Sequence, residues 1–324
     1  MKSSEVKQRM NLQGYRFVGD HSAVQICRWT KKSIRNEGVC YKEKFYGIKS
    51  HQCCQMTPWL GCPNKCIHCW RPVELDFDKL IGKTVDSPSE IIDDCIRAQR
   101  KLLEGFKILP KTANITRSKA DMKKWSEAQE PMQFAISLSG EPTIYPQIGE
   151  LIQELKKRGK TSFLVTNGLN PEKLEELIKK KQFPTQLYIS VNTSNEEAYN
   201  KFHRSSKKNA WELLNKSLGL MNKFPRSVFR MNLVRGLNMS DEMIPEYAKM
   251  IKKANPLFVE LKGFMSVGFA RERLGYDRMP DDKEMKTFAE KLAKETGLKV
   301  LDSHEHSRAW VLGKNKKDLK IKKI

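Results

Sequence analysis

The sequence predicts an α/β fold, a partial (β/α)6 barrel of the TIM type. From about residue 88 onward, short apolar strands alternate with helical patterns. Strict alternation of strand and helix is typical of parallel strands joined by crossover helices. The pattern gives about six strands, fewer than the eight of a closed barrel. The expected strands are residues 52–56, 134–138, 162–165, 187–191, 228–234 and 257–261.

Two terminal segments lie outside the alternating pattern. Residues 1–50 carry no such alternation and are expected to form an N-terminal extension. The barrel is expected over residues 51–302, and a C-terminal basic tail over residues 303–324. Residues 106–131 are longer than an ordinary connection, so we expect an insertion before the second strand.

The helices are predicted from caps and from apolar spacing. Ser87, Pro88 and Glu90 form a strong helix start, with proline at the first helical position. Apolar residues including Cys95 then recur on one face, so Cys95 is interpreted as a core cysteine. The same spacing predicts later helices around residues 148–155, 174–178, 211–221 and 244–251.

The composition indicates a protein with a substantial core and a polyanionic partner. Hydrophobic residues make up 39% of the 324 residues. No apolar run approaches the length of a membrane span and the N-terminus lacks a signal-peptide core, so we expect a cytoplasmic protein. Lys and Arg number 60 against 38 Asp and Glu, a formal charge of +22, and nucleic-acid phosphates are the favoured partner. Basic residues are enriched in residues 117–124, 201–208 and 314–324.

Three cysteines are crowded into one loop with C-x3-C-x2-C spacing: Cys62, Cys66 and Cys69, the loop triplet. A cubane iron–sulfur cluster needs four ligands, so three thiolates leave one iron open to a ligand that is not protein. Zinc is the competing interpretation, with His68, Cys53 or Cys54 completing a tetrahedral site. Disulfides are disfavoured because three thiols so close cannot pair off and nothing marks the chain as secreted.

A second set of cysteines recurs every thirteen residues: Cys27, Cys40 and Cys53, the N-terminal triplet. Spacing this wide does not by itself prove a site, and three unrelated cysteines would look the same. A second cluster with three thiolates and one open iron is the functional interpretation. Cys54 stands beside Cys53, and the sequence leaves open which of the two is the ligand.

Polar or flexible residues follow the predicted strands. Chemistry sits at the C-terminal ends of the strands in barrels of this type. One such residue would be an ordinary turn, but five strand ends in register indicate a site. These residues are Ser139, Gly140, Glu141 and Pro142; Thr166, Asn167 and Gly168; Ser190, Asn192 and Thr193; Asn232 and Arg235; Lys262 and Gly263.

The loop triplet resembles the signature of the radical S-adenosylmethionine (SAM) enzymes, in which SAM chelates the open iron of a 4Fe-4S cluster inside a partial (β/α)6 barrel. Ser139-Gly140-Glu141-Pro142 resembles the Gly-Gly-Glu motif that holds the SAM amino group, with Ser139 in place of the first glycine. The resemblance implies that the ribose and carboxylate of SAM are contacted by Thr166, Asn167, Ser190 and Asn192.

The two triplets together resemble the tRNA 4-demethylwyosine synthase family. Cys40-Tyr41-Lys42 and Phe45-Tyr46-Gly47 lie between them, and Cys66-Ile67-His68-Cys69-Trp70 closes the pattern, so the resemblance covers essentially the whole chain. It implies two 4Fe-4S clusters, the second on Cys27, Cys40 and Cys53. It also implies a carbon–carbon lyase that acts on the N1-methylguanosine beside the anticodon of tRNA(Phe). Pyruvate would supply two carbons, with Lys42 as its Schiff-base lysine, and a monomer would take electrons from an external flavodoxin- or ferredoxin-like donor.

Two other functions stay open at this point. A radical SAM methyltransferase or activase acting on another RNA or on protein would need neither pyruvate nor Lys42. A zinc-containing basic RNA-binding protein would use the cysteines structurally. Several aromatic residues are candidates for stacking on an RNA base, although each is also an ordinary core or rim residue: Trp59, Trp70, Tyr188 and Trp310.

Overall fold

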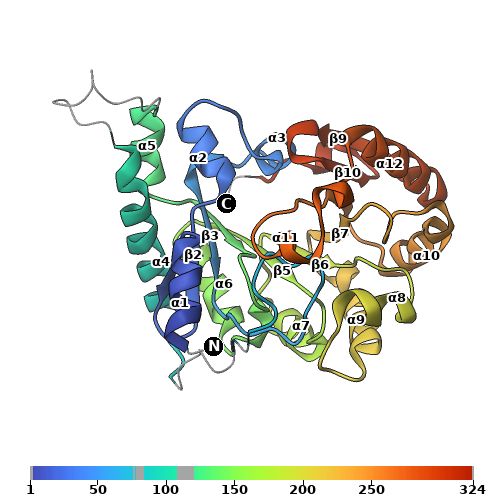
Figure 1. The fold of residues 1–324 in the computed structure, drawn as a ribbon, viewed down its shortest axis with the longest axis horizontal. Helices are drawn as coiled ribbons and strands as arrows, with labels where there is room; N and C mark the ends of the chain where they lie inside the picture. Colours follow the sequence, from blue (N-terminus) through green and yellow to red (C-terminus); the bar gives the residue numbers. More distant parts are fainter. Residues whose placement is uncertain (1–2, 76, 78–83, 108–119, 323–324) are drawn as a thin grey trace. The chain divides into compact units, whose positions relative to one another are not determined.

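The computed structural model describes residues 3–75, 77, 84–107 and 120–322 of the chain (Figure 1). The chain divides into two compact units. Unit 1 comprises residues 1–61, 77–164 and 320–324, and unit 2 comprises residues 62–76 and 165–319. Each unit has its own set of strands and helices, and each carries one of the two cysteine triplets.

Unit 1 contains a short antiparallel hairpin followed by parallel strands. The hairpin strand β2 pairs antiparallel with β3, and β3, β4 and β5 then run parallel. The boundary between the units falls within β5. The strands are β1 (Tyr15–Val18), β2 (Ser22–Gln25), β3 (Cys53–Thr57), β4 (Gln133–Ile136) and β5 (Thr161–Thr166).

The helices of unit 1 include the predicted crossover helices. Ser87 and Glu90 form a reciprocal capping box with proline at the start of α4, which confirms the predicted helix start. Within unit 1, α4 lies beside α6 and against β1 and β2 (Figure 1). The helices are α1 (Ser3–Leu12), α2 (Arg28–Ile34), α3 (Tyr41–Tyr46), α4 (Pro88–Leu103), α5 (Met122–Ala128) and α6 (Ile148–Lys157), with 3-10 turns η1 (Ser50–Gln52), η3 (Glu104–Phe106) and η5 (Pro142–Ile144).

Unit 2 holds three parallel strands extended by an antiparallel pair. β6, β7 and β8 are parallel, and β10 pairs antiparallel with both β8 and β9. The strands are β6 (Gln186–Ser190), β7 (Ser227–Leu233), β8 (Phe258–Gly263), β9 (Lys299–His304) and β10 (Ala309–Gly313). The helices are α7 (Pro171–Lys179), α8 (Glu196–His203), α9 (Ala210–Leu218), α10 (Ile244–Ala254), α11 (Ala270–Arg273) and α12 (Asp282–Thr296). The 3-10 turns are η6 (Met221–Lys223), η7 (Asp241–Met243), η8 (Tyr276–Arg278), η9 (Glu305–Ser307) and η10 (Lys316–Asp318).

The six expected strands occur as β3 to β8, each within a few residues of its predicted position. The structure adds four strands that the sequence pattern does not reveal. β1 and β2 are four residues long, too short for a period to show. β10 lies inside the segment 303–324 and is buried along its whole length, so it lacks the alternation of a half-exposed strand. Of the expected insertion 106–131, residues 108–119 lie outside the described residues.

The parallel strands of each unit contribute buried aromatic side chains to its core. Phe134 and Phe163 are fully buried in unit 1, and Tyr188, Phe229 and Phe258 are fully buried in unit 2. Full burial of one such side chain stabilises the fold by about 1.5–3 kcal/mol. Cys95 is also fully buried, which confirms its interpretation as a core cysteine. No helix among the described residues is both long and apolar enough to cross a membrane.

Candidate active site

The cysteine loop of unit 2 is pinned to the C-terminal end of α8. The main-chain N–H of Lys65 donates to the carbonyl of His203 over 2.9 Å, and that of Ile67 donates to the carbonyl of Phe202 over 3.1 Å. Asn64 also forms an isolated β-bridge with Ser205. These bonds hold the loop to a regular helix, so the three thiols have a rigid support.

Arg273 of α11 fixes the same loop from another side. Its guanidinium donates to the carbonyl of Ile67 over 3.1 Å, to that of Arg71 over 3.2 Å, and also to that of Cys69. Gly268 lies against Trp70 with a φ of +56°, and an added Cβ would fall 2.5 Å from the Trp70 carbonyl oxygen. Only glycine fits this approach, so the loop geometry is built into the chain.

The three thiols of the loop triplet share one electrostatic environment. Burial raises the pKa of the Cys66 thiol well above its ordinary value, and Cys69 and Cys62 raise it further. Arg71 is buried at 4% exposure, and although burial opposes its charge, the three thiols together raise its pKa. Three crowded thiols of this kind lose their protons only against added positive charge, which the irons of a cluster supply. The donor set therefore fits an iron–sulfur cluster.

The N-terminal triplet is assembled in unit 1 from three separate elements. Cys27 precedes α2, Cys40 precedes α3, and Cys53 begins β3. Burial raises the pKa of Cys40 to about 12, with a further rise from Cys27. Burial and Cys27 likewise raise the pKa of Cys53 to about 12. Residues thirteen positions apart in sequence are thus brought within electrostatic range of one another, as a second cluster requires.

Cys54 points away from this group. It is fully buried, and burial together with a hydrogen bond to Cys95 of α4 raises its pKa. Successive side chains of a strand face opposite sides, so only one of Cys53 and Cys54 can face Cys27. The structure places Cys53 on that side.

Lys42 lies beside the N-terminal triplet. It is on α3 with an exposure of only 6%, and its Nζ lies 4.7 Å from the centroid of the Phe163 ring. Its charge lowers the pKa of both Cys40 and Cys53, which places the ammonium close to both sulfurs. Lys44, two residues on, is exposed. Of these two neighbouring lysines, Lys42 is the one enclosed beside the cysteines.

Gly140 and Glu141 of the expected SAM motif are tied to the segment that precedes the loop triplet. Gly140 has a φ of +71°, and an added Cβ would fall 2.0 Å from the carbonyl oxygen of Trp59. The main-chain N–H of Glu141 donates to the carbonyl of Gly61 over 2.8 Å. The Oε1 atom of Glu141 accepts from the N–H of Thr143 over 3.1 Å. Ser139 Oγ is buried and has no hydrogen-bond partner in the described structure, so it is placed to meet a ligand.

The other expected SAM contacts lie at the ends of β5 and β6. Thr166 Oγ1 accepts from the N–H of Gly168 over 3.1 Å, and Asn167 Oδ1 accepts from the N–H of Leu169 over 2.9 Å. Asn192 Oδ1 accepts from the N–H of Asn232 over 2.8 Å, so this side chain braces the end of β6 to β7. Ser190 ends β6 and is half-buried.

Sequence reasoning missed three residues that contact the loop triplet or support its loop: Arg71, His203 and Arg273. His203 lies in the basic run 201–208, for which the sequence predicts contact with nucleic acid, yet Phe202 and His203 are buried at 4% and 3% exposure. The signal was available, because an aromatic pair at the end of an amphipathic helix is typical of a packed face.

The side chains of neither triplet are arranged around one point that could hold a single metal ion. No group of three His, Cys, Asp or Glu side chains in the described ranges is arranged to hold one metal ion. Zinc needs its ligands around one centre, whereas a cubane spreads its ligands over separate irons. His68, offered as a zinc ligand, packs against the Phe202 ring at 4.9 Å, and burial lowers its pKa to about 4.

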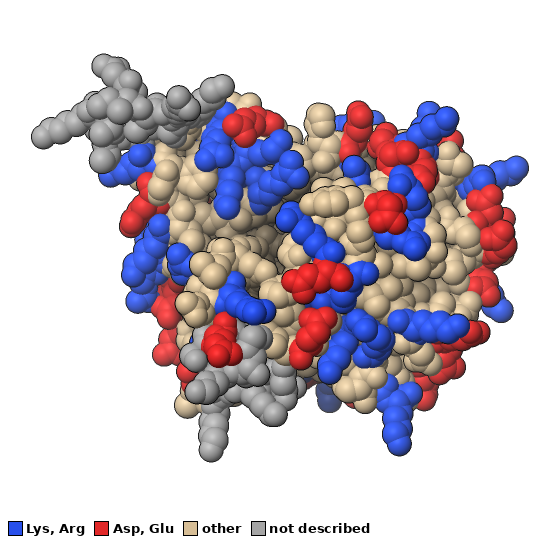
Figure 2. Space-filling model, viewed as in Figure 1, with Lys and Arg blue, Asp and Glu red and all other residues tan. Residues whose placement is uncertain are grey.

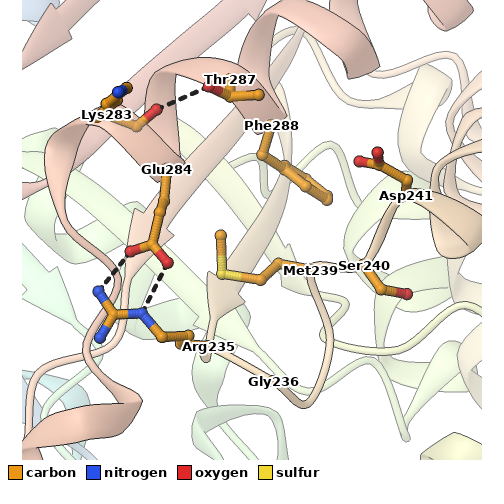
Figure 3. A pocket seen from close by; sticks show the side chains of 9 residues that line it. All are labelled: Arg235, Gly236, Met239, Ser240, Asp241, Lys283, Glu284, Thr287 and Phe288. Carbon is orange, nitrogen blue, oxygen red and sulfur yellow. Dashed lines mark hydrogen bonds and ion pairs between the residues drawn. The ribbon is translucent and has the colours of Figure 1, made fainter.

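Unit 2 also contains a cavity of about 400 Å³, and none of the residues that line it is a cysteine (Figure 3). Arg235 and Glu284 form an ion pair on one side of it, with Arg235 Nε donating to Glu284 Oε1 over 2.7 Å. Met239 and Phe288 contribute apolar side chains to its lining. Because Arg235 is already paired, this cavity has no unmatched charge from that residue to offer a ligand.

Comparison with known proteins matches nearly the whole chain. Residues 56–251 match the model of the Radical SAM superfamily, and residues 253–314 match that of Wyosine base formation. The S-adenosyl-L-methionine-dependent tRNA 4-demethylwyosine synthase of Pyrococcus abyssi is 46% identical over 95% of this chain and 88% of its own. The enzyme of the same name from Methanocaldococcus jannaschii is 33% identical over 96% of each chain.

Solved structures agree with these sequence matches. A structure of TYW1 with a lysine-pyruvate adduct bound has a TM-score of 0.83 and 32% identity, covering 98% of this chain and 97% of the other. An archaeal TYW1 structure has a TM-score of 0.76 and 29% identity, with 99% of each chain covered. The predicted α/β partial barrel is therefore confirmed.

Proposed function

The chain belongs to the tRNA 4-demethylwyosine synthase family of radical SAM enzymes, and on this premise we propose how its residues carry out that activity. The reaction joins pyruvate to the N1-methylguanosine beside the anticodon of tRNA(Phe) and gives the tricyclic wyosine base. Family membership favours this function over the two alternatives drawn from the sequence, a radical SAM methyltransferase or activase and a zinc-containing RNA-binding protein. The observation that carries the proposal is Lys42, enclosed beside a cysteine triplet in a chain similar to one solved with a lysine-pyruvate adduct.

A 4Fe-4S cluster and SAM are the cofactors of this family. Cys62, Cys66 and Cys69 are the residues that would hold the cluster, and Arg71 would balance its negative charge. When bound, the cluster and SAM supply the one-electron chemistry that makes a carbon radical on the substrate methyl group. Ser139 Oγ, buried without a partner in the described structure, is the clearest polar atom to meet SAM, with Glu141, Thr166, Asn167, Ser190 and Asn192 as further contacts.

The N-terminal triplet would hold a second 4Fe-4S cluster. Its three thiols lie in one buried group with mutually raised pKa values, and Cys53 rather than Cys54 faces that group. Three protein ligands leave one iron open, as in the loop triplet. The carboxylate or keto oxygen of pyruvate is a suitable occupant of that position, since hard oxygen ligands bind iron.

Lys42 would act on pyruvate as a nucleophile. Its unprotonated Nζ adds to the keto carbon of pyruvate, and loss of one water molecule leaves an imine. The enclosure of Lys42 at 6% exposure shields this imine from bulk water. An adjacent cluster that binds pyruvate would bring the keto carbon to the amine, which is an effect of proximity.

RNA recognition is supported by basic and aromatic side chains in both units. In unit 1, Arg28 and Lys31 of α2 and Arg35 directly after it are exposed, and Figure 2 shows Lys and Arg gathered over this helix. In unit 2, Trp70 and Tyr276 are 36% and 67% exposed. The main-chain N–H of Phe269 donates to the Trp70 carbonyl over 3.0 Å, so the segment around Phe269 adjoins the end of the cysteine loop. Unpaired bases of an anticodon loop stack on such aromatic rings.

The electron source is proposed to be an external one-electron donor, flavodoxin-like or ferredoxin-like, with the chain acting as a monomer. The external donor is supported by the chemistry alone, because reductive cleavage of SAM consumes an electron that the tRNA and pyruvate do not supply.

The proposed function is tested by trapping the imine. Borohydride added to the reconstituted protein with labelled pyruvate should fix the label on the peptide that spans residues 40–44. Lys42→Arg should abolish trapping, because a guanidinium stays protonated and makes no imine. Lys44→Arg and Lys49→Arg are matched controls that should trap as the wild type does. Label on Lys44 or Lys49, or full synthase activity in Lys42→Arg, would show that Lys42 is an ordinary lysine.

A further inference from the structure

Each sulfur of the loop triplet has a side-chain nitrogen donor of its own. Asn167 Nδ2 lies 3.7 Å from Cys62 Sγ, and His203 Nδ1 lies 3.2 Å from Cys66 Sγ. The Arg71 side chain hydrogen-bonds to Cys69. The three donors come from the end of β5, the last residue of α8 and the segment after the loop, and all lie within unit 2. One donor for each ligand is a pattern that neither the fold nor core packing requires.

The imidazole of His203 is held rigidly in place. It is 3% exposed and stacks on Tyr199, with ring centroids 4.4 Å apart and an angle of 22°. On another side, the His68 ring meets it edge-on with centroids 6.2 Å apart. The main chain of His203 also accepts from Lys65 of the cysteine loop, so the ring and the loop are fixed to each other.

The direction of the His203 hydrogen bond follows from the chemistry of a cluster ligand. A cysteine that ligates iron is a thiolate, which accepts hydrogen bonds and donates none. Nδ1 must therefore carry the proton. The opposite tautomer would aim the Nδ1 lone pair at the thiolate and bury an Nε2–H donor, and Nε2 has no partner among the described residues. Of the two neutral tautomers of His203, the one with its proton on Nδ1 is thus the form that the site selects.

Hydrogen bonds to the sulfurs of a cluster stabilise its reduced, more negative form and so raise its reduction potential. We propose that Asn167, His203 and Arg71 form a set of donors, one to each thiolate, that raises the reduction potential of the cluster on the loop triplet so that an external donor can reduce it. The proposal rests on the proposed function only for the presence of that cluster. His203 touches neither SAM nor RNA in this account, so it is a positioning and tuning residue.

The three donors differ in strength. Arg71 carries a full charge in a buried place, so its removal also removes a counter-charge and its effect is mixed. Asn167 is the most distant donor at 3.7 Å and is also an expected SAM contact. His203 is neutral, close and outside the expected SAM site, so its replacement isolates the hydrogen bond.

The test is a potentiometric titration of the reconstituted full-length protein, followed by electron paramagnetic resonance, without tRNA or pyruvate. The signal that shifts when SAM is added identifies the cluster of the loop triplet. His203→Phe keeps the ring and removes the N–H, and it should reduce the ratio of reduced to oxidised cluster at a fixed potential about tenfold, which is 59 mV for a one-electron couple. Tyr199→Phe, which keeps the stacking ring, should leave the ratio unchanged.

Two results would overturn the proposal. One is an unchanged potential in His203→Phe at full iron and sulfide content. The other needs no variant: wild-type protein labelled with nitrogen-15 histidine should show a hyperfine coupling between the reduced cluster and one histidine nitrogen, and its absence would contradict the hydrogen bond. Because these measurements omit pyruvate, they stand even where imine trapping on Lys42 fails, so the two proposals fail separately.

Discussion

The two cysteine triplets differ in how they are built and in what surrounds them. The loop triplet spans a few residues of one loop, and its sulfurs are met by the side chains of Asn167, His203 and Arg71. The N-terminal triplet is gathered from α2, α3 and β3, and hydrogen bonds to its sulfurs come from main-chain N–H groups of Lys42 and Ala135. Side-chain donors thus meet every sulfur of the loop triplet, whereas the donors to Cys40 and Cys53 are main-chain N–H groups.

The cation at each triplet matches the chemistry proposed there. Arg71 beside the loop triplet is a permanent charge that cannot act as a nucleophile. Lys42 beside the N-terminal triplet is an amine that can form an imine. An electron-delivering cluster needs only a stable counter-charge, while a cluster that presents pyruvate needs a reactive neighbour. The difference teaches that similar thiolate sets take their roles from the residues around them.

Replacing whole triplets should give the largest effect. Cys62→Ala, Cys66→Ala and Cys69→Ala together should remove one cluster and all SAM cleavage, because the open iron that holds SAM is lost. Cys27→Ala, Cys40→Ala and Cys53→Ala together should remove the other cluster and stop product formation while SAM cleavage continues. Iron and sulfide counts with release of 5′-deoxyadenosine measure both. Loss of all iron in either variant would contradict the separation of the sites.

The next largest effect is expected at Lys42. Lys42→Arg should lower product formation by about 10³-fold or more, the size of loss seen when a covalent nucleophile is removed. SAM cleavage should persist, since the loop triplet is intact. Lys44→Arg is the matched control, because Lys44 is on the same helix and exposed. Product formed at wild-type rate by Lys42→Arg would remove the distinction between the two cations.

Arg273→Ala should weaken the loop triplet alone. The guanidinium holds the carbonyls of Ile67, Cys69 and Arg71, and hydrogen bonds from a charged group contribute about 1.5–3 kcal/mol each. We expect a lower melting temperature and partial loss of iron from the loop triplet, with the N-terminal triplet fully loaded. Arg226→Ala is a control, since Arg226 donates to the carbonyls of Asp318 and Leu319 in the same unit. Equal iron loss from both triplets would show that Arg273 acts on overall stability.

The basic tail should contribute a moderate effect on RNA affinity. Leu319 is buried at 2% exposure and the N–H of Ile321 donates to the carbonyl of Tyr46 over 3.1 Å, so truncation would remove packing as well as charge. Substitutions that remove only the lysine charges test RNA binding without removing this packing. Lys314→Gln, Lys316→Gln and Lys317→Gln together should reduce the slope of log affinity against log salt by about 2, if all three meet phosphates.

The control for the tail is an equal charge change elsewhere. Lys249→Gln, Lys252→Gln and Lys253→Gln replace three exposed lysines of α10 and should leave the slope near that of the wild type. The same loss of slope in both variants would mean that the tail acts only through net charge.

The smallest effect concerns acid stability near the N-terminal triplet. Hydrogen bonds from His51 and Lys49 lower the pKa of Glu127 from 4.5 to about 2. A carboxyl whose pKa is lowered by folding stabilises the fold above its ordinary pKa, and this contribution is lost as the pH falls toward the folded value. Glu127→Gln should therefore be slightly less stable than the wild type at pH 7, with the difference vanishing toward pH 2. Melting curves that stay a constant distance apart at every pH would contradict this.

Much of the fold could be predicted because long elements repeat their pattern. α4 combines a capping box with a periodic apolar face, and β3 to β8 alternate with helices of ordinary length. The hairpin β1 to β2 could not be predicted, since four residues carry no period and its stability comes from pairing with β3. β10 is likewise defined by its pairing to β8, and β9 by its pairing to β10, which are tertiary properties.

The site could be predicted where ligands are close in sequence and not where they meet through folding. The loop triplet is visible from its spacing, and Lys42 from its family context. Which of Cys53 and Cys54 faces Cys27 could not be predicted, because it depends on the orientation of the strand. The burial of His203 does not follow from the basic run around it, because charge pattern alone does not reveal which side of a helix is buried; only the aromatic pair Phe202-His203 indicates it.

The central claim is that the two triplets hold two clusters with separate ligands. Its most direct measurement is a crossed titration by electron paramagnetic resonance, in which SAM and carbon-13 pyruvate are added separately to each triple-cysteine variant. SAM should change the signal only where the loop triplet is intact, and pyruvate only where the N-terminal triplet is intact. A variant whose single remaining cluster responds to both ligands, or to the wrong one, would contradict the account.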